Sequence, residues 1–128
     1  MSETEIIKQF KNSIISFLDE LIGQFPNEGD LVIFRIFLKD RIPIVDIMNY
    51  FVRCILPLKD IIKERDEDFF LNKCTLFESV TGQTDKNKVN RFKTLWRSPS
   101  LDEEDRKIIW TWFDSFVYLT EKYQKSKN

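Results

Sequence analysis

Large apolar residues recur at intervals of three and four along most of this chain, which is the spacing that places side chains on one face of an α-helix. The first run begins just after Ser2 and Glu5, whose separation is that of a helix-capping box. Its members are Ile7, Phe10, Ile14, Leu18, Leu21 and Phe25. The pattern predicts a first helix over about residues 3–24.

Turn-forming residues separate the first helix from the next two apolar runs. Residues 26–30 have the composition of a turn, and Asp30 is placed to cap a second helix over residues 31–38. That stretch is apolar on nearly every side, and its β-branched and aromatic residues also suit a buried strand. Its helical neighbours favour a helix. A third run begins after Pro43, and Pro57 must kink or divide it.

The second half of the chain carries shorter elements and one long final helix. Acidic residues at 66–68 suit the first turn of a short helix, and a further short helix ends just after Trp96. Between them, residues 79–87 form the polar, turn-rich stretch expected of an exposed, mobile loop. Ser100 and Glu103 repeat the capping-box spacing, so they predict the start of the final helix.

These elements predict an all-α fold, a compact bundle of five or six helices. Its core should be rich in Phe, Ile and Leu from the first, third and last helices. With 128 residues, the chain can bury a core without disulfides or a structural metal. We expect a single helical domain over residues 1–128, with a mobile loop near 79–87 and a polar, lysine-rich tail near 122–128.

The composition argues against several kinds of chemistry. The chain has no His, which removes Ser-His and Cys-His nucleophiles and His-ligated zinc. Its three glycines are too scattered for a phosphate-binding loop, and Cys54 and Cys74 form no disulfide framework. The acidic clusters at 64–68 and 102–105 stand where helices should begin, so capping explains them better than a metal site. We therefore expect a non-enzymatic protein with no metal and no cofactor, and keep a carboxylate–metal enzyme as a third alternative.

Charge and hydropathy bear on the surroundings of the protein. The N-terminus is acidic, and no apolar run approaches the ~18 residues that a membrane span requires. We therefore expect an intracellular protein with no membrane partner. The formal net charge of -1 argues against a wholly basic nucleic-acid binder but leaves room for a local basic patch.

An aromatic cluster in the final helix supplies the first candidate site. Residues 110–118 hold five aromatic side chains, more than one helix face can bury. Either this helix is the central one of the bundle, or part of its aromatic surface binds a partner. Trp110 and Tyr118 fall outside the main aromatic stripe, so they are the candidate partner-binding residues. A protein partner or self-association is the expected mode of action.

A basic segment supplies the alternative. Residues 86–97 hold five basic residues and no acidic one, and as a helix they would be amphipathic. Such a cationic face can contact nucleic-acid phosphates, although an ordinary solvated helix face looks the same. The candidate nucleic-acid-binding residues are Lys86, Lys88, Arg91, Lys93 and Arg97, with Lys122, Lys125 and Lys127 in the tail.

Several short motifs are distributed along most of the chain. They are Phe25-Pro26, Asp30-Leu31, Leu56-Pro57-Leu58-Lys59 and the segments at 65–71, 92–98, 101–105 and 110–116. In these motifs the chain resembles small helical proteins encoded by nucleocytoplasmic large DNA viruses of protists and algae. The resemblance implies a setting in the host cytoplasm or the virion, and we expect the protein to act there as a virion or replication-factory component. It supplies no catalytic residues.

Overall fold

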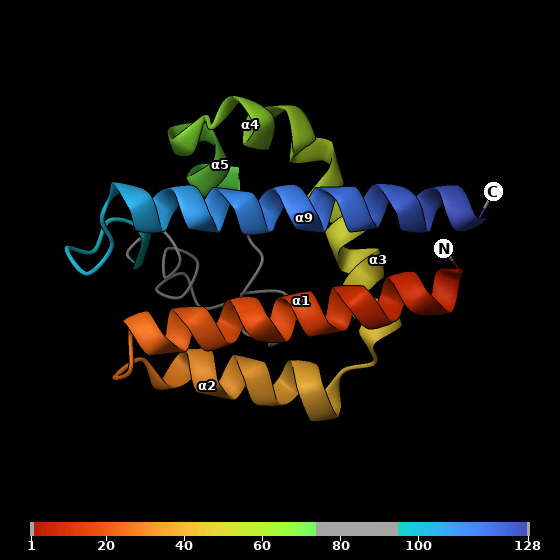
Figure 1. Ribbon diagram of the computed structural model, residues 1–128, viewed down its shortest axis with the longest axis horizontal. Coiled ribbons are helices and arrows are strands. Elements are labelled where there is room, and N and C mark those ends of the chain that lie inside the picture. Colours follow the sequence, from red (N-terminus) through yellow and green to blue (C-terminus); the bar gives the residue numbers. More distant parts are fainter. Residues whose placement is uncertain (1, 74–94, 128) are drawn as a thin grey trace.

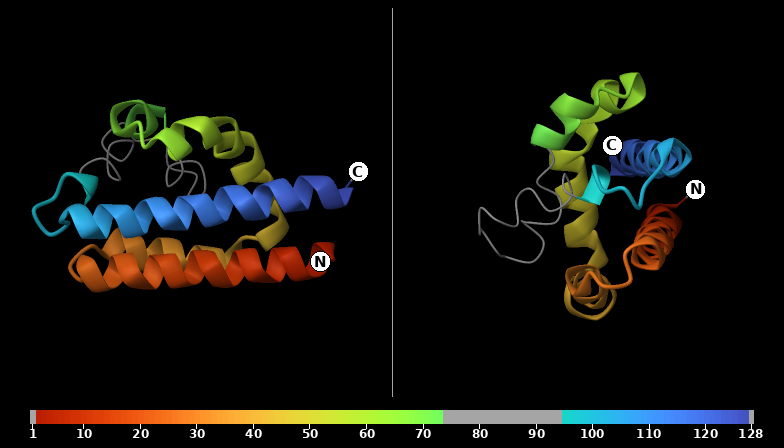
Figure 2. Two further views of the ribbon diagram at one scale, coloured as in Figure 1. Left: turned by 45° about the horizontal axis from the view of Figure 1, so that its top comes forward. Right: turned by 90° about the vertical axis from the view of Figure 1, so that its left-hand side faces the viewer.

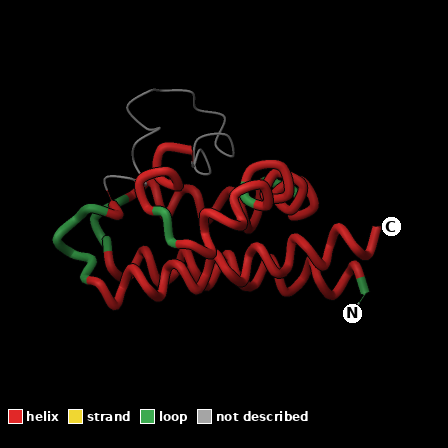
Figure 3. Tube along the Cα trace, turned by 90° about the horizontal axis from the view of Figure 1, so that it is seen from above, coloured by secondary structure: helices red, strands yellow, loops and turns green. Residues whose placement is uncertain are grey.

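The computed structural model describes residues 2–73 and 95–127, and every regular element in these two ranges is a helix (Figure 3). The α-helices are α1 (Glu3–Gln24), α2 (Gly29–Ile36), α3 (Ile44–Cys54), α4 (Lys59–Glu64), α5 (Glu67–Lys73) and α9 (Glu103–Lys127). A π-helical turn over Phe37–Arg41 extends α2, and a 3-10 turn over Leu56–Leu58 joins α3 to α4. The predicted all-α fold is confirmed.

The two long helices form the centre of the molecule. Helices α1 and α9 run antiparallel and side by side, and they make the most extensive helix contact (Figures 1 and 2). Helix α2 packs on α1 at one edge, while α4 and α5 lie beyond α9 at the other. Helix α3 crosses between these two edges and contacts both long helices (Figure 2). The last helix is therefore covered on two sides, as its excess of aromatic residues requires.

Aromatic rings fill the space where α1, α3 and α9 meet. The ring of Phe116 in α9 lies edge-on to Phe17 in α1 and to Phe51 in α3, with centroid distances of 5.5 and 5.6 Å. Phe10 meets Phe51 in the same way at 5.0 Å. Edge-to-face contacts of this kind add about 0.5 to 1.5 kcal/mol each to the free energy gained from burial. The first, third and last helices supply the core, as predicted.

The start of α1 agrees with the prediction from the sequence, whereas the start of α2 differs from it. The backbone N–H of Glu5 donates to Ser2 Oγ at 3.2 Å, so the predicted cap of α1 is confirmed. The prediction that Asp30 caps the second helix is wrong, because α2 already begins at Gly29 and Glu28 is the residue before it. The chain becomes helical directly after the turn of residues 26–28, and α2 therefore begins one residue before Asp30.

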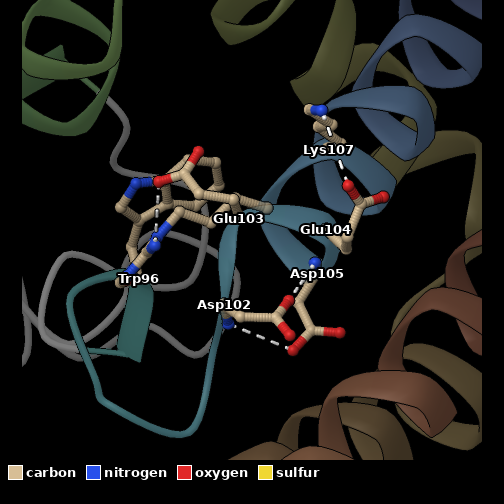
Figure 4. A network of polar contacts seen from close by, with 7 residues as sticks. Trp96, Asp102, Glu103, Glu104, Asp105 and Lys107 are labelled. Carbon is tan, nitrogen blue, oxygen red and sulfur yellow. Dashed lines mark hydrogen bonds and ion pairs between the residues drawn. The ribbon is translucent and has the colours of Figure 1, made fainter.

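The cap of α9 also differs from the prediction. Asp102, and not Ser100, caps this helix: the N–H of Asp105 donates to Asp102 Oδ1 at 2.8 Å, and the N–H of Asp102 donates to Asp105 Oδ2 at 3.2 Å (Figure 4). Leu101 is buried and anchors the chain just before the helix, so the residue that follows it takes the capping position. The two carboxylates form a reciprocal capping box, with Asp105 in the place usually held by Glu.

The lysine-rich end of the chain is not a separate tail. Helix α9 continues to Lys127 because Tyr123 is buried in the core. The ammonium groups of Lys122 and Lys127 lie over the rings of Tyr118 and Tyr123, at 4.8 and 4.6 Å from the ring centroids. The predicted loop near 79–87 and most of the predicted basic helix lie outside the described residues.

Candidate protein-interaction surface

Trp110, one of the two predicted partner-binding residues, belongs to the core. Its side chain is 6% exposed, and its ring centroid lies 5.2 Å from that of Phe70 and 5.1 Å from that of Trp96. The prediction that Trp110 faces a partner is therefore wrong. The physical reason is that α9 has a second buried side, which α5 and the turn containing Trp96 cover.

Arg65 closes this second side of the core. It has left-handed backbone angles, φ 57 and ψ 40, and ends α4. Its guanidinium donates to the carbonyl of Ile62 at 2.7 Å and to both carboxylate oxygens of Asp114 at 2.8 and 2.7 Å. The hydrogen bond to Asp114 and the negative charge of that carboxylate raise the pKa of Arg65 above its usual value. With its guanidinium carbon 5.5 Å from the Trp110 ring centroid, Arg65 holds the α4–α5 corner against α9.

Tyr118, the second predicted partner-binding residue, stands on the outer side of α9. Its side chain is 53% exposed and shares that side with Thr111 and Lys125, which are also exposed. A single aromatic residue among polar ones is ordinary for a protein surface. The role of Tyr118 in binding a partner stays a prediction.

The basic residues proposed for nucleic-acid binding are only partly described. Arg97 is described, and its guanidinium lies 3.5 Å from the carboxylate of Asp68 in α5. The others in that segment, Lys86, Lys88, Arg91 and Lys93, lie outside the described residues. Lys125 is exposed at the C-terminal end of α9, far along the sequence from Arg97. The nucleic-acid interface stays a prediction as well.

A surface that was not predicted lies on α2. Val32, Ile33 and Ile36 are 41%, 50% and 47% exposed, and their spacings of three and four residues place them on one face. We call these three residues the α2 face. Among the side chains that the structure describes, Val45, Phe69, Ile108 and Tyr118 have comparable exposure, and no two of these four lie within a helical turn of each other. Among the described side chains, the α2 face is thus the one set of three such residues that lie within a helical turn.

The opposite side of α2 fixes this face in place. Leu31, Phe34 and Leu38 are buried, each with 4% exposure or less. The side chain of Arg35 donates from Nε to Asp19 Oδ1 of α1 at 2.6 Å, which ties the helix to its neighbour. Helix α2 is therefore apolar both inside and outside, and a helix of that kind is normally covered on all sides. The all-round apolar pattern of residues 31–38 was the sequence signal for this surface.

Two other kinds of site are absent from the described residues. Residues 2–73 and 95–127 contain no group of three or more His, Cys, Asp or Glu side chains placed to hold a metal ion. No helix within these ranges combines the length and the apolar character needed to cross a membrane.

No protein-family model, curated protein or solved structure matches the chain.

Proposed function

We propose that this protein is a non-enzymatic interaction module that binds a protein partner through the α2 face. The observation that carries the proposal is the exposure of about half of each of three adjacent large side chains, Val32, Ile33 and Ile36, on one edge helix. Exposed apolar side chains that adjoin one another are more typical of protein-binding sites than apolar side chains that are exposed singly. The buried side of α2 holds the surface in position before a partner arrives, which lowers the entropic cost of binding.

The contribution of the α2 face to the free energy of binding follows from the exposed fraction of its three side chains. Burying a whole Val or Ile side chain contributes about 1.5 to 3 kcal/mol, so covering the exposed half of the three side chains contributes about 2 to 4 kcal/mol. A loss of that size weakens binding by roughly 30-fold to several hundred-fold. The α2 face is therefore large enough to be the energetic centre of an interface, with polar neighbours at its rim.

The resemblance to proteins of large DNA viruses supplies the setting of this proposal. In that setting the partner is a component of the virion or of the replication factory. The support for this part is the resemblance of the short sequence motifs alone. It determines where a partner is sought and has no bearing on which surface binds it.

The test is a comparison of two triple variants. One replaces Val32, Ile33 and Ile36 with Ser, and the control replaces Glu104, Lys107 and Thr111 with Ser on the exposed side of α9. Both variants are immobilised and incubated with an extract of the cells in which the protein occurs naturally, and the bound proteins are quantified by mass spectrometry. We expect a defined set of proteins, or the chain itself, to be lost with the α2 variant and retained with the control. If every bound protein is recovered equally with both variants, the α2 face is not the binding surface.

A further inference from the structure

A groove of about 340 Å³ lies between the C-terminal end of α1 and the N-terminal end of α9. Its floor includes the core side chains Leu21 and Ile109, and its rim includes Ile108, which is 49% exposed. This volume is near the lower end of the range for small-molecule pockets. The groove is on the α1–α9 pair and is separate from the α2 face.

Two of the residues that line the groove, Glu20 and Asp105, are acidic. Among residues 2–73 and 95–127, neither Glu20 nor Asp105 pairs with a Lys or Arg. Each is instead held by a neutral donor: the indole N–H of Trp112 donates to Glu20 Oε2 at 2.8 Å, and the backbone N–H of Asp102 donates to Asp105 Oδ2. Both side chains are therefore oriented, yet neither forms an ion pair with a Lys or Arg of the described residues.

Two acidic residues beside the groove, Glu103 and Glu104, differ in this respect. Glu103 lies 3.4 Å from Arg106, and Glu104 lies 3.6 Å from Lys107. Figure 4 shows Glu104 directed toward Lys107, while Asp105 is directed toward Asp102 on another side of the helix. Among the described residues, Glu103 and Glu104 are thus paired with cations, whereas Glu20 and Asp105 at the groove, and Asp102 beside Asp105, are not.

We infer that this groove binds a cationic amphipathic segment of a protein partner. An apolar side chain of that segment would pack against Leu21, Ile108 and Ile109, and Lys or Arg one helical turn away would pair with Glu20 and Asp105. Charge complementarity is the argument for this occupant: an acidic or neutral segment would leave both oriented carboxylates uncompensated beside an apolar surface. The inference is independent of the α2 face and identifies a second site with its own partner chemistry.

A model peptide provides the probe. A fluorescein-labelled helix of Lys and Leu, roughly 14 residues or four turns long, presents an apolar stripe flanked by cations. The same peptide with Glu in place of Lys is its control. Fluorescence anisotropy at low ionic strength should show binding of the Lys peptide to the full chain, weaker binding as salt is added, and none of the Glu peptide. Absence of Lys-peptide binding at low ionic strength would overturn the inference.

Matched charge variants locate the binding site. Glu20→Gln with Asp105→Asn keeps the acceptor oxygens that hold Trp112 and the helix cap, but removes both charges. Glu103→Gln with Glu104→Gln removes two charges from the same end of α9. We expect the first pair to weaken binding about tenfold, as the loss of two partly exposed ion pairs requires, and the second to change it less than about twofold. Equal weakening by both pairs would mean general attraction to a negative surface and would overturn the proposed site.

A third variant fills the groove without touching its charges. Gly23 lines the groove, and a Cβ placed there meets no atom within 4 Å, so Gly23→Leu adds an apolar side chain and improves a helical position. This variant should keep its melting temperature and lose the peptide. If it still binds the peptide and the α2 triple Ser variant does not, the peptide occupies the α2 face. That result would overturn the groove inference and leave the proposed function standing.

Discussion

Replacing Trp110 tests which aromatic residues of α9 belong to the core. Trp110 is 6% exposed and lies between the rings of Phe70 and Trp96, with the guanidinium of Arg65 over its face. Trp110→Ala therefore removes a large buried side chain together with two aromatic contacts. Substitutions of this kind cost about 3 to 5 kcal/mol because the surrounding structure relaxes only partly into the cavity.

The matched substitution on the same helix is Tyr118→Ala. Tyr118 is 53% exposed, and the ammonium group of Lys122 lies over its ring. Loss of that contact and of partial burial costs at most about 1 kcal/mol. The two substitutions remove side chains of similar size, eight residues apart, and the structure predicts a difference of at least about 2 kcal/mol between them.

Urea unfolding followed by circular dichroism measures both free energies of unfolding. Domains of this size have a total stability of about 5 to 15 kcal/mol, so Trp110→Phe serves as a milder variant if Trp110→Ala does not fold. We expect Trp110→Phe to cost about 1 to 3 kcal/mol. Equal stabilities of Trp110→Ala and Tyr118→Ala would refute the burial of Trp110 and restore it as a surface residue.

Three further predictions concern the ion pair between Arg65 and Asp114, the cap of α9 and the basic segment. A double-mutant cycle of Arg65→Ala and Asp114→Ala should give a coupling energy of about 1 kcal/mol. This value is at the upper end for exposed ion pairs because the contact is bidentate. Losses of unfolding free energy that simply add in the double mutant would contradict the prediction. Asp102→Ala should destabilise the protein by about 1 kcal/mol through loss of the α9 cap, whereas Ser100→Ala should have no such effect on chemical unfolding. Charge reversal at Lys93 and Arg97 should leave binding of duplex and single-stranded DNA unchanged in gel-shift assays at low salt if protein binding is the function; a strong reduction would support the basic segment instead.

The fold was predictable because apolar spacing and helix-breaking residues agree in most segments. Residues 31–38 show how tertiary packing resolved an ambiguity: their β-branched residues allow a strand, and packing of Leu31, Phe34 and Leu38 on α1 made them a helix. The Asp102 cap was missed because Ser100 with Glu103 has the more familiar residue types. The burial of Leu101 that selects Asp102 depends on contacts distant in the sequence.

The candidate surfaces were less predictable than the fold. An aromatic cluster such as residues 110–118 does not indicate which rings meet other helices, so Trp110 and Tyr118 could not be separated before their neighbours were known. The α2 face carries ordinary core residues, and it is exposed only because α2 lies at an edge of the bundle (Figure 1). The lack of a basic partner for Glu20 and Asp105 within residues 2–73 and 95–127 likewise depends on how the helices place the cations of those residues.

Site-specific photo-crosslinking tests the α2 face most directly. A photoreactive amino acid is placed at Ile33, and at exposed Thr111 of α9 as the control, in protein produced in its native cells. The account predicts that position 33 forms a defined crosslink to one protein, either a partner or a second copy of the chain. That crosslink should disappear when Val32 and Ile36 are changed to Ser. Crosslinking at position 33 that is no greater than at position 111, or that persists in the Ser variant, would contradict it.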